Sequence, residues 1–186
     1  MAKKYVPRHV TQADGSRCQW TNCWAATGAW LVDGGTLGKH KPTPMEFRAA
    51  ARALKGCRPG GYGDLIAGLA HFGVKAILLD DISIPAAKKR LRNDNGRKLY
   101  AMASDWSRWP DVDKCRGDYD GYHMAGLVPG KKVVKGKAEI RTNDPLCNRM
   151  RWVRMSGIVR AGEEYNREHG GKPRTMDLLV ISVPKE

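Results

Sequence analysis

The run CWAATGAWLV, residues 23–32, is the stretch that decides the fold. It is almost wholly apolar, and it follows Thr21 and Asn22, whose side chains are of the kind that cap helix N-termini. The pattern predicts a buried helix that begins at Cys23. A thiol in that place lies beside unpaired backbone N–H groups, and their partial positive charge favours the thiolate.

A second informative segment is GYHMAGL, residues 121–127. From His123 onward it is typical of a strand, which the Pro-Gly pair just after it is expected to end in a turn. A basic turn follows, and the alternating polarity of residues 138–142 predicts the returning strand. Antiparallel pairing would bring Asn143 and Asp144 back beside His123.

A thiol, an imidazole and a carboxylate or amide together suit nucleophilic catalysis, because the third group holds one imidazole nitrogen and aims the other at the sulfur. We therefore expect Cys23 to be the nucleophile, His123 the base and Asp144 the orienting group, with Asn143 as the alternative. Taken singly, these residues have structural interpretations, since a buried cysteine packs as a small hydrophobe and Asp-Pro marks a turn. Their order and context favour catalysis.

The order Cys, His, Asn/Asp and the CWAA motif resemble the papain-like cysteine peptidases, including the bacteriocin-processing branch. The phrases CWAATGAWLVDGGTLGK, GGYGDLIAGLAHFGV, GYHMAGL and NDPLCNRMRWV are similar to small papain-like proteins encoded by phages of actinobacteria. The resemblance implies an α+β papain-like fold, in which a nucleophile helix and further helices pack on a C-terminal antiparallel sheet. It also implies a peptidase or amidase that uses no cofactor and no metal.

The oxyanion donor is where the chain departs from this family. The spacing at which papain relatives place an oxyanion-hole glutamine before the cysteine falls here on Arg17. Gln19 would reach the site from a tight loop, and Gln12 would reach it if residues 13–22 bulge outwards. The backbone N–H of Cys23 is a donor in either case, because a helix N-terminus leaves it unpaired.

Length and composition predict one domain over residues 1–186, with residues 1–17 as an N-terminal arm. No segment is long and apolar enough to span a bilayer. The basic N-terminus lacks the apolar stretch of a signal peptide, so secretion by the general pathway is not expected. Together with the resemblance to phage-encoded proteins, this makes a phage virion or the host cytoplasm the expected location.

The formal net charge of +14, from 33 basic and 19 acidic residues, favours a polyanionic partner such as nucleic acid, an anionic cell wall or an acidic neighbour in a virion. The basic residues concentrate at 88–92, 131–137 and 149–154. No zinc finger or RNA-recognition pattern accompanies them, so no motif supports a nucleic-acid partner.

The five cysteines are odd in number and form no CxxC pair, so neither a disulfide framework nor a zinc site is predicted. They are Cys18, Cys23, Cys57, Cys115 and Cys147. A metal site, if the fold built one, would draw on Cys18, Cys57, Cys115 and His71.

Local patterns predict four further helices, the first of which begins at a Thr-Pro-Met-Glu capping box. They predict strands mostly in the second half of the chain. The helices are expected over 43–55, 63–72, 83–91 and 155–169, and the strands over 74–79, 98–103, 123–128, 138–142 and 177–183. The active cleft is expected between the helical half and the strand-rich half. In the long loop over 105–120, Trp106 and Trp109 are interpreted as groove-lining or simply packed.

Two classes of function therefore compete. The first is a cysteine peptidase or amidase that acts on protein or on peptidoglycan cross-bridges. The second is a virion protein of the tail or head that keeps this fold for binding, with weak activity or none, because a fold does not determine a function. A basic nucleic-acid-associated protein with structural Cys and His is a third interpretation, and salt-dependent DNA binding would support it.

Overall fold

The computed structural model describes residues 5–12, 21–51, 57–93, 97–109, 121–147 and 149–185. At its centre is a six-stranded antiparallel sheet with the order β1-β6-β2-β3-β4-β5. The strands are β1 (Ala76–Ser83), β2 (Lys98–Asp105), β3 (Tyr122–Val134), β4 (Lys137–Asn143), β5 (Arg151–Arg154) and β6 (Thr175–Ser182).

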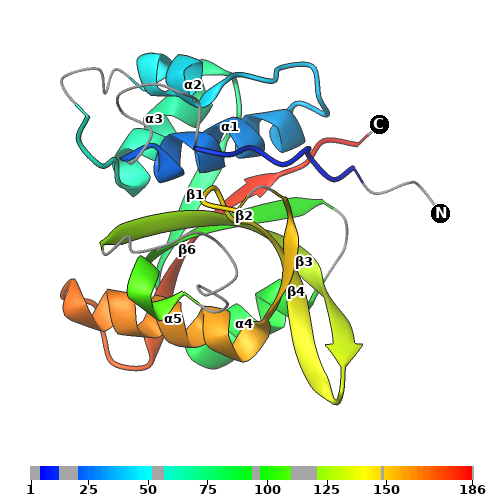
Figure 1. Ribbon diagram of the computed structural model, residues 1–186, viewed down its shortest axis with the longest axis vertical. Coiled ribbons are helices and arrows are strands. Elements are labelled where there is room, and N and C mark those ends of the chain that lie inside the picture. Colours follow the sequence, from blue (N-terminus) through cyan, green and yellow to red (C-terminus); the bar gives the residue numbers. More distant parts are fainter. Residues whose placement is uncertain are drawn as a thin grey trace.

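Helices cover both faces of this sheet (Figure 1). Helices α1 (Cys23–Gly35), α2 (Pro44–Ala50) and α3 (Tyr62–His71) form one layer, and α4 (Ile84–Arg92) and α5 (Met155–Glu168) form the other. Among the described residues, no helix has the length and apolarity that a membrane crossing would need.

Each face of the sheet carries its own hydrophobic core, and β2 contributes to both. Leu99, Ala101 and Ala103 pack with α1 to α3, whereas Tyr100 and Met102 pack with α5. Successive strand residues point to opposite faces, so a strand covered on both sides is apolar throughout rather than alternating. This explains the unbroken run LYAMA.

Helix α1 is buried over most of its length and lies directly against β3. A Cβ added at Gly126 would lie 2.5 Å from the Trp30 ring, so this strand approaches the helix as closely as only glycine allows. One turn after Cys23, the Thr27 hydroxyl donates to the Met124 carbonyl at 3.0 Å. The start of α1 is thereby fixed against the start of β3.

Some predicted elements differ from the structure. The capping box at Thr43 and Glu46 forms, but α2 ends at Ala50, and residues 52–56 lie outside the described residues. The turn expected at Pro129 is wrong, because β3 continues through it to Val134. The pairing of β3 with β4 is irregular between Val128 and Lys132, and such an irregularity accommodates a proline that has no N–H to donate.

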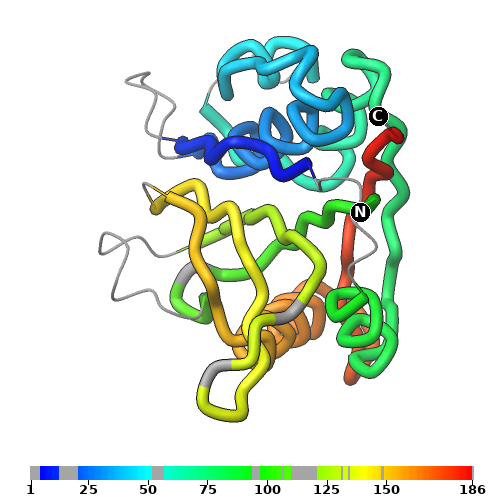
Figure 2. Tube along the Cα trace, turned by 90° about the vertical axis from the view of Figure 1, so that its right-hand side faces the viewer, coloured from blue at the N-terminus to red at the C-terminus, as the bar shows by residue number. Residues whose placement is uncertain are grey.

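The N-terminal segment 5–12 runs alongside α1 and past the end of β4 (Figure 2). Its hydrogen bonds reach both Asp33 in α1 and Asn143 in β4. This segment therefore connects the layer that carries Cys23 with the part of the sheet that precedes Asp144.

Candidate active site

Cys23 is the first residue of α1 and is 2% exposed. Asn22 precedes it at the N-cap position, but the prediction that the Asn22 side chain caps the helix is wrong. That side chain instead accepts a hydrogen bond from Arg48 Nη1 at 2.9 Å and approaches the Met45 sulfur at 3.7 Å. A buried guanidinium needs acceptors, and it takes the amide oxygen that would otherwise cap α1.

Arg48 itself was not predicted, because a buried arginine has no signature in the sequence. It is 1% exposed, and its guanidinium lies 5.6 Å from the centre of the Trp24 ring. Its Nη2 donates to the Arg58 carbonyl at 2.9 Å. The arrangement places a positive charge beside the first turn of α1, where it adds to the positive end of the helix dipole.

His123 lies near the start of β3 and is fully buried. Its Nε2 is 3.2 Å from Asp144 Oδ1, and the imidazole also interacts with the Cys23 thiol. The Cys23 sulfur is 3.9 Å from the Tyr122 carbonyl, and the Trp109 ring packs edge-on against the imidazole at 5.3 Å. The structure thus brings Cys23, His123 and Asp144 together, under the cover of Trp109.

The electrostatics of this group favour a charged imidazole. Burial alone would lower the pKa of His123, but the charge of Asp144 and the hydrogen bonds to Asp144 and Cys23 raise it to about 9. The imidazole is therefore protonated at neutral pH. An imidazolium in contact with a thiol stabilises the thiolate, which is the nucleophilic form of cysteine.

Of the two candidates for the orienting group, Asp144 has the oxygen at the imidazole. Its Oδ1 also accepts from the Leu146 N–H at 3.1 Å, so the carboxylate is held in a tight turn. The Asn143 side chain lies on Val10: Oδ1 accepts from the Val10 N–H at 3.0 Å, and Nδ2 donates to the Val10 carbonyl at 3.4 Å.

Comparison with solved structures shows what this arrangement is similar to. A crystal structure described as that of a C39-like peptidase from Bacillus anthracis matches with a TM-score of 0.58 and 13% identity, over 98% of this chain and 96% of that one. The chain has the fold of a C39-like peptidase. This likeness confirms the predicted α+β papain-like fold and, at such identity, shows the fold alone.

Other comparisons add little to the C39-like fold. The Pseudomonas avirulence protein AvrPphB aligns over 88% of this chain and 92% of its own, with 11% identity. The TM-score of 0.36 is too low to show a shared fold. No protein-family profile and no curated protein sequence matches the chain.

The oxyanion donor within this C39-like fold stays a prediction. Gln19 lies outside the described residues. Gln12 is buried beside the turn that follows Asp144, where its backbone N–H donates to the Pro145 carbonyl at 3.0 Å.

The expectation of no disulfide framework is wrong. Cys57 and Cys147 each take part in a disulfide bond, whereas Cys23 is a free thiol. Pairing depends on which cysteines the fold brings within bonding distance, and sequence spacing does not reveal this. Among the described residues, no group of three or more His, Cys, Asp or Glu side chains is placed to hold a metal ion.

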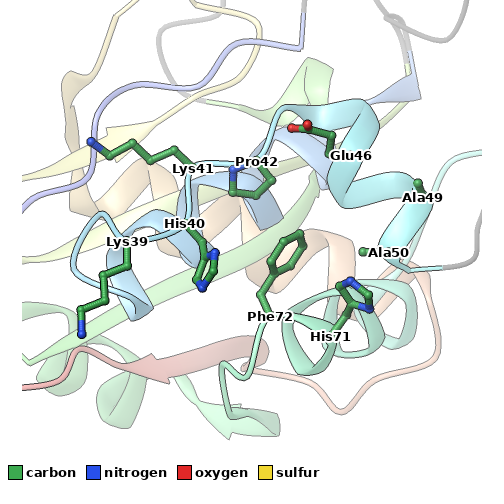
Figure 3. A pocket seen from close by; sticks show the side chains of 9 residues that line it. All are labelled: Lys39, His40, Lys41, Pro42, Glu46, Ala49, Ala50, His71 and Phe72. Atoms are coloured by element: carbon green, nitrogen blue, oxygen red, sulfur yellow. The ribbon is translucent and has the colours of Figure 1, made fainter.

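A hollow of about 640 Å³ opens on the surface, and Cys23 is not among the residues that line it (Figure 3). It is lined by Lys39, His40, Lys41, Pro42, Glu46, Ala49, Ala50, His71 and Phe72. The rings of His40 and His71 flank Phe72, while Lys39 and Lys41 extend away from it. Because the charged groups do not converge, we assign no ligand to this hollow.

The basic segments belong to several elements. Lys89, Arg90 and Arg92 end α4, and Lys132 of β3 lies 5.9 Å from the ring of Trp152, which is 43% exposed on β5. The polyanionic, virion and nucleic-acid partners stay predictions.

Proposed function

We propose that this chain is a cysteine peptidase or amidase that hydrolyses peptide bonds through Cys23, His123 and Asp144. The observation that carries the proposal is the meeting of all three side chains in one buried site, with Cys23 at a helix N-terminus and His123 Nε2 3.2 Å from Asp144 Oδ1. The C39-like fold supports it.

In the proposed mechanism the Cys23 thiolate attacks the carbonyl carbon of the scissile bond. The resulting oxyanion is stabilised by the Cys23 N–H at the start of α1, and by Gln19 if that residue reaches the site. His123 then gives its proton to the leaving amine, and a thioester to Cys23 remains. Water, deprotonated by His123, attacks the thioester, which releases the acid and restores the Cys23 thiolate beside the protonated His123. Asp144 orients the imidazole and stabilises its charged form.

The substrate within this proposal is a peptide bond in a protein or in a peptidoglycan cross-bridge. Phage origin rests on the sequence resemblance of the four phrases CWAATGAWLVDGGTLGK, GGYGDLIAGLAHFGV, GYHMAGL and NDPLCNRMRWV. One observation favours the alternative of a fold kept for binding: Cys23 is only 2% exposed and His123 is fully covered.

The test combines cysteine labelling with hydrolysis. We expect iodoacetamide to modify Cys23 readily at neutral pH in the wild-type protein. In His123→Ala we expect this reactivity to be lost at neutral pH and to return only at alkaline pH, as for an ordinary thiol, as read by peptide mass spectrometry. Comparing one protein across pH cancels the effect of limited access. We also expect Cys23→Ala to abolish cleavage of a mixed peptide library and of purified peptidoglycan while circular dichroism stays unchanged.

Ser104→Ala provides the matched control. Ser104 pairs with His123 across β2 and β3, and its buried hydroxyl has no hydrogen-bond partner among the described residues. We expect this variant to label and cleave as the wild type does. Labelling of Cys23 that is indifferent to His123 would refute the catalytic proposal, and normal labelling without any cleavage would favour the binding alternative.

A further inference from the structure

Residues 5–12, which we call the N-terminal strap, are attached to the nucleophile helix at one end. Asp33 of α1 is 1% exposed, and the strap uses both of its carboxylate oxygens. The Tyr5 hydroxyl donates to Oδ1 at 2.7 Å, and the Arg8 N–H donates to Oδ2 at 3.0 Å. Two hydrogen bonds to one buried carboxylate hold this end of the strap on α1.

The other end of the strap is attached to the turn that carries Asp144. The Gln12 N–H and the Thr11 hydroxyl both donate to the Pro145 carbonyl, at 3.0 and 3.1 Å. The His9 Nε2 lies 2.7 Å from the Cys147 carbonyl oxygen. The turn is also closed internally, because the Cys147 N–H donates to the Asp144 carbonyl at 3.1 Å.

Asn143 completes this attachment. Its side chain is fully buried, and it contacts both the N–H and the carbonyl of Val10 at 3.0 and 3.4 Å. Its own backbone pairs with Gly126 in the β3–β4 ladder. Asn143 is therefore held from two directions, and the residue bonded to it is Asp144.

We propose that Asn143 is a positioning residue, which holds the Asp144 carboxylate at His123 by fastening the end of β4 to the N-terminal strap. The inference rests on the proposed function, in which Asp144 orients the imidazole. The 3.2 Å contact between Asp144 and His123 is near the upper end of the range for a hydrogen bond, so a small displacement of the turn would break it. A displacement of about 1 Å in a catalytic group can cost about 100-fold in rate.

Among the described residues, few titratable groups face the imidazole. They are Asp144 from the turn after β4 and Cys23 from α1, while the Trp109 ring that packs against it is uncharged. A change in the position of Asp144 thus changes the protonation of His123 directly. The pH profile of the site reports this change, and a loss of stability alone does not move it.

Two variants weaken the contact between the Asn143 side chain and the Val10 backbone, one from each partner. Asn143→Ala removes both hydrogen bonds to Val10, and Val10→Pro removes the donating N–H while Asn143 stays intact. Thr142→Val is the control, because Thr142 is the buried neighbour in β4 whose hydroxyl bonds to the Arg151 carbonyl and not to the strap.

We expect kcat to fall between about 10- and 100-fold in both strap variants with KM unchanged, because the contact acts on the imidazole and not on substrate binding. The pH profile of Cys23 alkylation should shift towards that of His123→Ala. Thr142→Val should lower only the thermal midpoint. If Asn143→Ala fails to fold, Val10→Pro alone decides.

The outcomes separate this inference from the proposed function. If Cys23 is alkylated with the same pH profile in the wild-type protein and in His123→Ala, the proposed function is refuted. Labelling that depends on His123 but is unchanged in both strap variants would leave the function intact and overturn the positioning role of Asn143.

Discussion

Replacing Asp144 with asparagine removes the negative charge that lies beside the His123 imidazole and changes little else in the site. The amide oxygen can keep the place of Oδ1, which lies 3.2 Å from Nε2 and accepts from the Leu146 N–H at 3.1 Å. Burial lowers the pKa of His123, and the charge of Asp144 is the largest influence that opposes it. We therefore expect the pKa to fall in Asp144→Asn.

The size of the effect follows from the wild-type value. The pKa of His123 is raised from 6.5 to about 9, which corresponds to about 3 kcal/mol of folding free energy. Because the folded pKa lies above the unfolded one, this stabilisation is complete below about pH 6.5 and is lost as the pH rises through about 9. In Asp144→Asn it should be absent, since a buried imidazole with a lowered pKa resists protonation.

Urea unfolding of the two proteins across this pH window measures the difference. We expect the wild-type protein to be more stable than Asp144→Asn by about 3 kcal/mol at the acid end, with the gap closing towards the alkaline end. NMR titration of the His123 imidazole gives the pKa directly, and Ser104→Ala should titrate as the wild type does. Parallel loss of stability in both proteins would show that Asp144 does not set the charge of His123.

Two further predictions concern the contact of α1 with β3. Gly126→Ala should lower the free energy of unfolding by between about 1 and 3 kcal/mol, because its Cβ would lie 2.5 Å from the buried Trp30 ring. Gly63 has open space around it, so Gly63→Ala should not lower the stability measured by thermal unfolding. Thr27→Val should lose about 1 kcal/mol by removing the 3.0 Å hydrogen bond to the Met124 carbonyl; unchanged stability would show that this bond does not hold the helix.

The sequence predicted those parts of the fold whose causes are local. The apolar run 23–32 forms a buried helix because almost all of its side chains are apolar. The capping box at Thr43 and Glu46 forms because its two partners are three positions apart in the sequence. The strand at GYHMAGL appears for the same reason.

Features that depend on distant partners could not be predicted. Strand β5, with four residues, is too short to show a period, and it exists because β4 offers a free edge. The burial of Arg48 depends on acceptors from residues 22 and 58. The disulfide bonds of Cys57 and Cys147 depend likewise on three-dimensional proximity.

The pair Asn143 and Asp144 shows how one strand end can serve two purposes. Successive residues of an extended chain point to opposite sides, so of two adjacent polar side chains only one can face a given imidazole. The sequence left both residues as candidates for the orienting group, because which of them faces His123 depends on the register of β4 against β3. That register pairs Asn143 with Gly126, and it leaves the carboxylate at the imidazole and the amide on Val10. The division suits the chemistry, because a charge stabilises the imidazolium, whereas an amide, with both a donor and an acceptor, matches the N–H and carbonyl of a passing strand.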